Sequence, residues 1–149
     1  MATNVTVDTS VIVKALVPPR RKKQDKLFDL QRELHLSCRD VLLKTESGEY
    51  ANHIPLLALI ETACVVSRLS DTQRAGLALT FLGQNSGFYG DAYLMERSIR
   101  IGMRTKASGF DVVFMACAEE TGSILITDDR KMYDRANDYG LDVIFIRDV

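Results

Sequence analysis

The sequence has few cysteines and arranges none of them in a metal-binding or redox motif. Its three cysteines, Cys38, Cys64 and Cys117, include no Cys-x-x-Cys pair. Cys64 and Cys117 lie in apolar runs, where a free thiol usually behaves as a small hydrophobic side chain. We therefore expect a protein of the reducing cytoplasm.

Long apolar runs, glycine-rich segments and excess charge are missing as well. With 9 glycines and 3 prolines in 149 residues, neither a disordered chain nor a repeat array is favoured. No run of about 18 apolar residues is present, and no signal peptide precedes Val5, so no membrane association is expected. The net charge of −1 argues against binding nucleic acid through bulk positive charge, but local basic patches stay compatible with it.

The remaining pattern alternates short β-branched segments with amphipathic ones. Strands are expected at 4–8, 53–54, 88–89, 123–127 and 142–146. Helices are expected at 11–16, 22–36, 39–44, 56–69, 71–82, 91–104, 111–120 and 130–139. This alternation predicts one α/β domain over residues 1–149, a three-layer α/β/α fold around a parallel sheet of four to five strands. In such sheets ligands collect beyond the carboxyl ends of the strands, where the strand order reverses.

Acidic residues stand at two of these strand ends. Asp8 closes the first strand, and Asp128 and Asp129 follow the strand that ends at Thr127. Each could cap the next helix. A pair of acids is nevertheless more than a cap needs, so a functional role is also expected here.

Glu61 interrupts an apolar stripe. Its neighbours on the expected helix face are Leu57, Cys64 and Val65. Burying an isolated charge costs several kcal/mol unless the charge is paired or binds a metal. Arg68, one further turn along, is the alternative partner.

Asp111 opens an apolar helix. Phe110 and Met115 have the spacing of a hydrophobic staple, which predicts Asp111 as the N-cap. An N-capping aspartate can still turn one oxygen toward a site, so the two roles are compatible.

Together the four acids suggest one chemistry. Clustered carboxylates repel one another unless one is protonated or a cation lies between them. Mg²⁺ favours a few carboxylates with retained water, and such an ion activates water for attack on a phosphodiester. The pattern therefore favours metal-assisted phosphodiester hydrolysis.

The order of the motifs resembles that of PIN-domain ribonucleases. The matching segments are V-D-T-S-V-I at 7–12, I-E-T-A at 60–63, F-D-V-V-F-M-A-C-A-E-E at 110–120 and L-I-T-D-D at 125–129. The resemblance implies that Asp8, Glu61, Asp111 and Asp129 form a Mg²⁺ or Mn²⁺ site. It makes Ser10 and Thr127 supporting hydroxyls, and it puts Asp128 at a variable position, behind the metal ligands or at the surface.

The size is similar to that of the toxin subunits of VapBC toxin–antitoxin pairs. That likeness implies an endoribonuclease acting on RNA, a homodimer, and inhibition by a small antitoxin protein. The expected products are a 5′-phosphate and a free 3′-hydroxyl, since no histidine pair is placed to activate the 2′-hydroxyl.

Basic side chains near these motifs are candidates for RNA contact, although each could equally be an ordinary solvated charge. The candidates are Arg20, Arg21, Arg130 and Lys131. Arg97, Arg100 and Arg104 recur on one helical face and allow the same two interpretations.

Other functions fit less well or stay open. A haloacid-dehalogenase-type enzyme would have a second aspartate where this chain has Ser10, and a receiver domain would have a lysine after its late strand, where Arg147 follows Ile146. A non-catalytic PIN-like scaffold that binds RNA or protein remains an alternative, and so does a DNA substrate.

Overall fold

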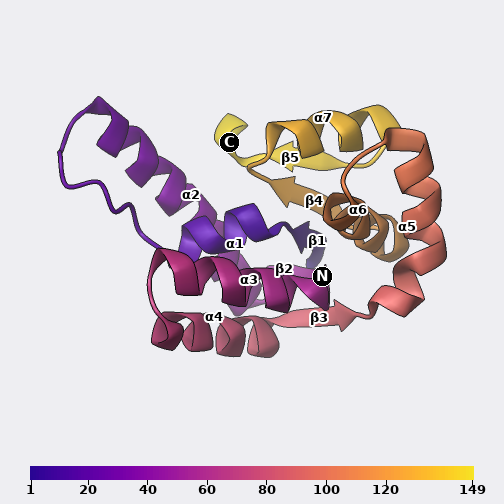
Figure 1. The fold of residues 1–149 in the computed structure, drawn as a ribbon, viewed down its shortest axis with the longest axis horizontal. Coiled ribbons are helices and arrows are strands. Elements are labelled where there is room, and N and C mark those ends of the chain that lie inside the picture. The colour runs from indigo at the N-terminus through magenta and orange to yellow at the C-terminus, as the bar shows by residue number, and fades with distance from the viewer.

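The computed structural model describes all residues from 1 to 149, and its centre is a parallel sheet (Figure 1). The five strands are β1 (Thr3–Val7), β2 (Tyr50–Pro55), β3 (Ser86–Tyr89), β4 (Ile124–Thr127) and β5 (Val143–Phe145). Their order across the sheet is β3-β2-β1-β4-β5, and every neighbouring pair is parallel. The expected α/β class and strand number are confirmed.

Seven helices and one short 3₁₀ turn connect the strands. They are α1 (Thr9–Leu16), α2 (Lys26–Ser47), α3 (Leu57–Leu69), α4 (Thr72–Asn85), α5 (Asp91–Thr105), α6 (Gly109–Thr121), α7 (Arg130–Tyr139) and η1 (Ile146–Asp148).

The strand order divides the helices between the two faces of the sheet. The connections from β1 to β2 and from β2 to β3 run toward one edge and carry α1 to α4. The connections from β3 to β4 and from β4 to β5 run toward the other edge and carry α5 to α7. Because parallel crossovers are right-handed, opposite directions place the helices on opposite faces. The result is the three-layer α/β/α arrangement.

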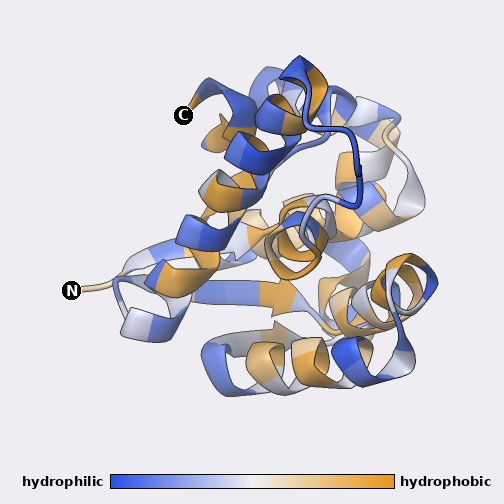
Figure 2. Cartoon of the chain, turned by 90° about the vertical axis from the view of Figure 1, so that its left-hand side faces the viewer, coloured by the Kyte–Doolittle hydropathy of each residue, from blue (hydrophilic) through white to orange (hydrophobic).

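The core lies between these layers. It includes Val5 and Val7 of β1 and Leu125 and Ile126 of β4, all nearly inaccessible to solvent. Strands buried on both faces need continuous apolar segments, which is what these two sequences supply. The outer helices alternate between hydrophobic and hydrophilic segments (Figure 2), as helices with one face on a sheet do.

The segment after α1 differs from the expectation. Two helices were expected at 22–36 and 39–44, but α2 is one continuous helix. It begins after Asp25, whose side chain accepts a hydrogen bond from the Phe28 amide, and ends at Gly48, which has a φ of 85°. No glycine or proline interrupts residues 26–47, so nothing breaks the helix between the two apolar patterns.

The start of α6 also differs. The expected N-cap, Asp111, is wrong, because the helix begins at Gly109 and Ser108 occupies the cap position. Asp111 lies in the first turn instead. Phe110 is 61% exposed, so it forms no staple with the buried Met115. None of the helices is long and apolar enough to cross a bilayer.

Asn52 of β2 joins three strands through its side chain. The pairing of β1 with β2 ends at Val5 and Asn52. Beyond that point the Val7 amide donates to the Asn52 Oδ1 atom at 3.1 Å, and the Asn52 Nδ2 atom donates to the Ser86 hydroxyl of β3 at 3.2 Å. Asn52 thus extends the ladder up to the residue before Asp8.

Replacing Asn52 with leucine should lower the free energy of unfolding by about 1–3 kcal/mol, because the buried Val7 amide loses its acceptor. Urea unfolding followed by circular dichroism measures this loss. Ser86→Ala removes only the second bond, at a half-buried position, and should cost about 0.5–1.5 kcal/mol. Equal midpoints for Asn52→Leu and the unmodified protein would contradict this role.

Candidate functional site

The sheet reverses its strand order between β1 and β4. The helices that follow these strands leave toward opposite faces, and sheets of this kind bind ligands beyond the carboxyl ends of the strands at this point. Asp8 follows β1 and Asp129 follows β4 after one intervening residue. Both acids therefore stand at the position where a ligand of this kind of sheet is expected.

Asp8 is a buried carboxylate held by two hydroxyl groups. Its Oδ2 atom accepts hydrogen bonds from Ser10 Oγ at 2.7 Å and from Thr127 Oγ1 at 3.0 Å, while only 7% of the residue is exposed. Asp8 occupies the N-cap position of α1, but its side chain makes no bond to the helix backbone. The capping interpretation of its side chain is therefore wrong. Ser10 and Thr127, which the resemblance gives as supporting hydroxyls, both contact Asp8.

Asp129 is fixed by the start of α7. Its Oδ1 atom accepts from the amides of Lys131 at 2.9 Å and Met132 at 3.2 Å, and its own amide donates to Thr127 Oγ1 at 3.0 Å. Capping is confirmed for this residue. Only Oδ1 is used in the cap, so the other oxygen of this exposed side chain stays available.

Glu61 reaches the same edge from α3. Its Oε1 atom accepts a hydrogen bond from Thr9 Oγ1 at 2.9 Å. Arg68 forms no ion pair with it, although both side chains line one hollow. The alternative partner suggested by the sequence is therefore not used, and Glu61 is half-buried beside α1.

The pKa values of three of these acids are raised, and the charge of at least one other acid contributes to each shift. Burial, opposed by the hydroxyl bonds and reinforced by Asp111, raises the pKa of Asp8. Burial, together with the charges of Asp8 and Asp111, raises the pKa of Glu61. Burial and the charge of Asp129 raise the pKa of Asp111, against a bond from Ser108 and the charge of Arg135. These shifts link four acids from four segments into one cluster.

None of the four acids forms a salt bridge, which is the arrangement a cation would complete. The donor set consists of hard carboxylate oxygens, which suits Mg²⁺ or Mn²⁺ with several retained waters. No three acidic side chains are close enough, as placed, to share one ion. In their chemistry and charge alone, the acids fit a hard cation.

Asp128 has the opposite environment, which the sequence did not reveal. Its side chain is buried and pairs with Lys14 of α1 and with Arg147 of η1, whose Nε lies 2.7 Å from Oδ1. Burial raises its pKa, but bonds from Arg147 and Lys14 outweigh that effect, so its pKa is lowered. A surface position for Asp128 is wrong. Lys14 lies 114 residues from Asp128 in the sequence, so local pattern gave no signal for this ion pair.

The basic residues that the sequence offers for RNA contact already bind other groups of the chain. Lys131 is the exception, and it is exposed. Arg20 donates to the Leu69 carbonyl and Arg21 pairs with Asp25. These two bonds tie the segment after α1 to its surroundings, and they leave only part of each guanidinium for a ligand.

The other candidate arginines contact residues of their own helix or of a neighbouring element. Arg130 lies 3.3 Å from Asp134 and stacks over Tyr133 and Phe145. Arg97 and Arg100 both pair with Glu119, and Arg104 stacks on Tyr139. The structure thus favours surface charge over phosphate contact for the α5 arginines.

Comparison with known proteins supports the fold. No family model and no curated protein matches the sequence. The solved structure of PAE2754 from Pyrobaculum aerophilum resembles this chain with a TM-score of 0.57 and 18% identity, over 91% of this chain and 87% of its own. A domain of a functionally unknown protein from Methanocaldococcus jannaschii gives 0.52 and 18%, over 97% and 91%. At this identity the likeness concerns the fold alone.

Asp8 and Asp128 are both buried carboxylates, yet their amide variants should shift stability in opposite directions. In chelator at neutral pH, Asp8→Asn should raise the melting temperature by about 2–4 °C, since about 1 kcal/mol of charge burial is relieved. Asp128→Asn should lower the free energy of unfolding by about 1–3 kcal/mol, because it leaves two cations without their partner. Thermal unfolding followed by circular dichroism measures both.

The pH dependence has a definite sign. The raised pKa of Asp8 penalises the folded state only above the ordinary value near 3.8, since below it both states are protonated. The advantage of Asp8→Asn should therefore vanish in acid. Added Mg²⁺ or Mn²⁺ should stabilise the unmodified protein and not the variant. A destabilised Asp8→Asn at neutral pH would contradict the acid cluster.

Proposed function

We propose that this protein is a Mg²⁺- or Mn²⁺-dependent endoribonuclease of the PIN type, acting through Asp8, Glu61, Asp111 and Asp129. The observation that carries the proposal is the convergence of four carboxylates that are distant in sequence and form no salt bridge. A fold gains no stability from such a cluster, so its presence is typical of a functional site.

Each acid has a role in this proposal. Asp8 and Asp129 would bind the cation directly, and Glu61 and Asp111 directly or through water. Bound there, the cation would supply positive charge to the scissile phosphate and lower the pKa of a water molecule. The rest falls to the chain: Ser10 and Thr127 orient the carboxylate of Asp8, and Thr9 orients that of Glu61.

The shape of the site supports a polymeric substrate. Asp8 is buried, Glu61 and Asp111 are half-buried, and Asp129 is exposed, so the group of acids reaches the surface at Asp129. A small metabolite is usually enclosed on most sides, whereas an extended RNA strand can cross an open edge. A DNA strand could do the same, and the cleavage assay compares the two.

The histidines support hydrolysis without help from the 2′-hydroxyl. His35 bonds to the Lys14 carbonyl at 2.6 Å, and His53 bonds to the Tyr89 hydroxyl and to Asn4. Neither belongs to the acid cluster. The proposed products are therefore a 5′-phosphate and a 3′-hydroxyl.

The toxin role rests on the resemblance to VapBC toxins, with cytoplasmic location, a homodimer and a small antitoxin as its further parts. An exposed apolar stripe on α5 supports an additional protein contact. Met95, Ile99 and Met103 are spaced four residues apart and are 53%, 54% and 72% exposed. Such a stripe is more often covered by a partner than left in water.

A second candidate is a scaffold that binds RNA or protein without cleaving it. It is favoured by one observation, that no three acids are poised to share an ion.

Cleavage of RNA separates the two candidates. With Mn²⁺ the unmodified protein should cleave RNA, EDTA should abolish the activity, and renewed Mn²⁺ should restore it. Asp8→Asn and Asp129→Asn should each lower the rate by about 100-fold or more, as loss of a charge-stabilising group does. Gel electrophoresis of end-labelled RNA and DNA measures rates and end groups. A folded protein that cleaves neither polymer with either metal would support the scaffold instead.

Thr127 offers a test of positioning. Thr127→Val removes the hydroxyl that holds Asp8 and should lower the cleavage rate by about 10–100-fold with little change in fold. Thr62→Val is the matched control, because Thr62 is equally buried and its hydroxyl has no partner. If both variants lose activity to the same extent, the hydroxyl of Thr127 has no special role.

A further inference from the structure

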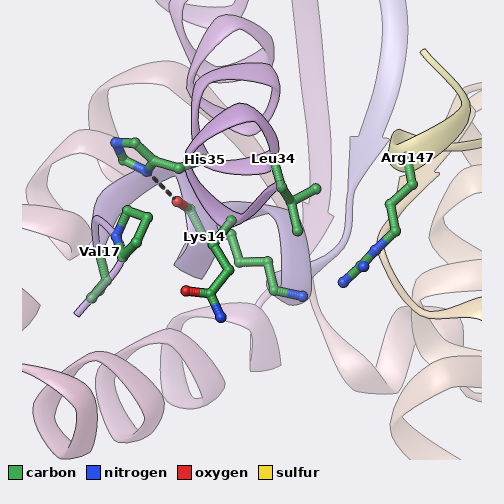
Figure 3. A pocket seen from close by; sticks show the side chains of 7 residues that line it. Lys14, Val17, Leu34, His35 and Arg147 are labelled. Atoms are coloured by element: carbon green, nitrogen blue, oxygen red, sulfur yellow. Dashed lines mark hydrogen bonds between the residues drawn. The ribbon is translucent and has the colours of Figure 1, made fainter. Parts of the chain in front are cut away.

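A hollow of about 230 Å³ lies between α1, α2 and η1. Its lining includes Lys14, His35 and Arg147. The volume exceeds that of several water molecules at about 30 Å³ each in the liquid, so a phosphate group fits with part of its hydration. The Lys14 ammonium and the Arg147 guanidinium point toward each other across this hollow (Figure 3).

The charges in the hollow do not cancel. Lys14 and Arg147 share one carboxylate, that of Asp128, so one positive charge is left over. The Asp128 side chain is fully buried beneath them, whereas those of Lys14 and Arg147 are 40% and 55% exposed. Asp128 uses one ammonium hydrogen and two guanidinium nitrogens. Lys14 and Arg147 therefore retain donors that face solvent, in fixed positions.

The backbone around this pair is also fixed. His35 of α2 bonds through Nδ1 to the Lys14 carbonyl at 2.6 Å, as the dashed line in Figure 3 marks. This bond joins α2 to α1 at the residue that carries the ammonium group. The buried Asp128 and the bonded His35 together pre-organise the two cations, which lowers the entropy cost of binding an anion.

Short contacts connect the hollow to the acids. Ser10 Oγ donates to Asp8 at 2.7 Å and accepts from the Asp128 amide at 3.0 Å. Ser10 and Lys14 stand four residues apart and so share one face of α1. An anion at Lys14 and Arg147 would therefore lie about one helical turn from Ser10, which contacts Asp8.

We propose that Lys14 and Arg147 form a subsite for a backbone phosphate of the RNA substrate, next to the phosphodiester that is cleaved. This inference rests on the proposed nuclease function and names how the substrate is held. A polyanion approaching four carboxylates is repelled until it meets positive charge, and these two side chains supply that charge at the rim. Asp128 is a positioning residue in this subsite, because it acts through the two cations above it.

The salt dependence of RNA binding tests the subsite. A fluorescently labelled single-stranded RNA of random sequence is titrated in EDTA, so that it binds without being cut, and anisotropy gives Kd at several salt concentrations. Arg147→Gln and Lys14→Gln should each weaken binding several-fold and reduce the slope of log K against log salt by about 0.7, the value for one lost phosphate contact. A change confined to folding would not alter this slope in the protein that remains folded.

Arg100→Gln is the matched control. Arg100 is also 55% exposed and also shares a carboxylate, Glu119, with a second basic residue, Arg97. Its replacement should leave both affinity and slope unchanged. If Arg147→Gln and Arg100→Gln behave alike, or if the unmodified protein binds no RNA at low salt, the subsite is refuted.

Two further results separate the proposals from each other. Cleavage of RNA by the unmodified protein, with an unchanged salt slope in Arg147→Gln, would overturn the subsite and leave the nuclease proposal standing. Absence of cleavage, with a reduced slope in Arg147→Gln, would support the subsite in a binding scaffold. Poly-glutamate that binds more tightly than RNA, and through Arg147, would assign the hollow to an acidic polypeptide and overturn the subsite.

Discussion

The hydrogen bond from Thr127 to Asp8 joins the ends of the two central strands, and the arrangement of the site depends on it. β1 and β4 are neighbours in the sheet although Asp8 and Thr127 are 119 residues apart in the sequence. Their pairing brings the hydroxyl of Thr127 to the carboxylate of Asp8 and, through the Asp129 amide, fixes where α7 begins. One threonine thereby sets the relative position of two acids and the start of a helix.

Neighbouring acids at this edge serve opposite purposes. Asp128 is neutralised by Lys14 and Arg147, and its lowered pKa reflects a stable ion pair. Asp8, Glu61 and Asp111 have raised pKa values and no such partner. Under the proposed function, the cluster would lower the stability of the free protein and recover it when a cation binds, which is the usual trade between stability and function at a site. The ion pairs of Asp128 join α1 and η1 to the end of β4 and stabilise this arrangement, whereas the repulsion between the clustered acids opposes it.

The sequence predicted what depends on local pattern and failed where distant residues decide. The sequence could predict the β-branched strands, the capping by Asp129 and the acids at strand ends, because each depends on residues close by in the chain. The break expected inside α2 was wrong, since two apolar patterns there belong to one long helix that packs on different neighbours. Asp111 was assigned to the wrong cap position because Ser108 competes for it, and tertiary packing decides between them. The partners of Asp128 come from α1 and from the end of the chain, so no spacing rule could have found them.

The net charge is only −1, yet acidic and basic side chains occupy separate places at this edge of the sheet. The proposed polyanionic substrate would need this separation. A strongly basic surface would attract RNA but would also pair with and neutralise the carboxylates that must hold a cation. An acidic surface would keep the carboxylates free and repel the substrate. Here most of the candidate arginines already pair with glutamates, aspartates or carbonyl groups of the chain itself. The excess positive charge beside the acids is carried by Lys14 and Arg147, which Asp128 holds away from the cluster. That buried aspartate lets the two opposite charges stand side by side without cancelling, which the proposed metal site would require in order to accept a nucleic acid.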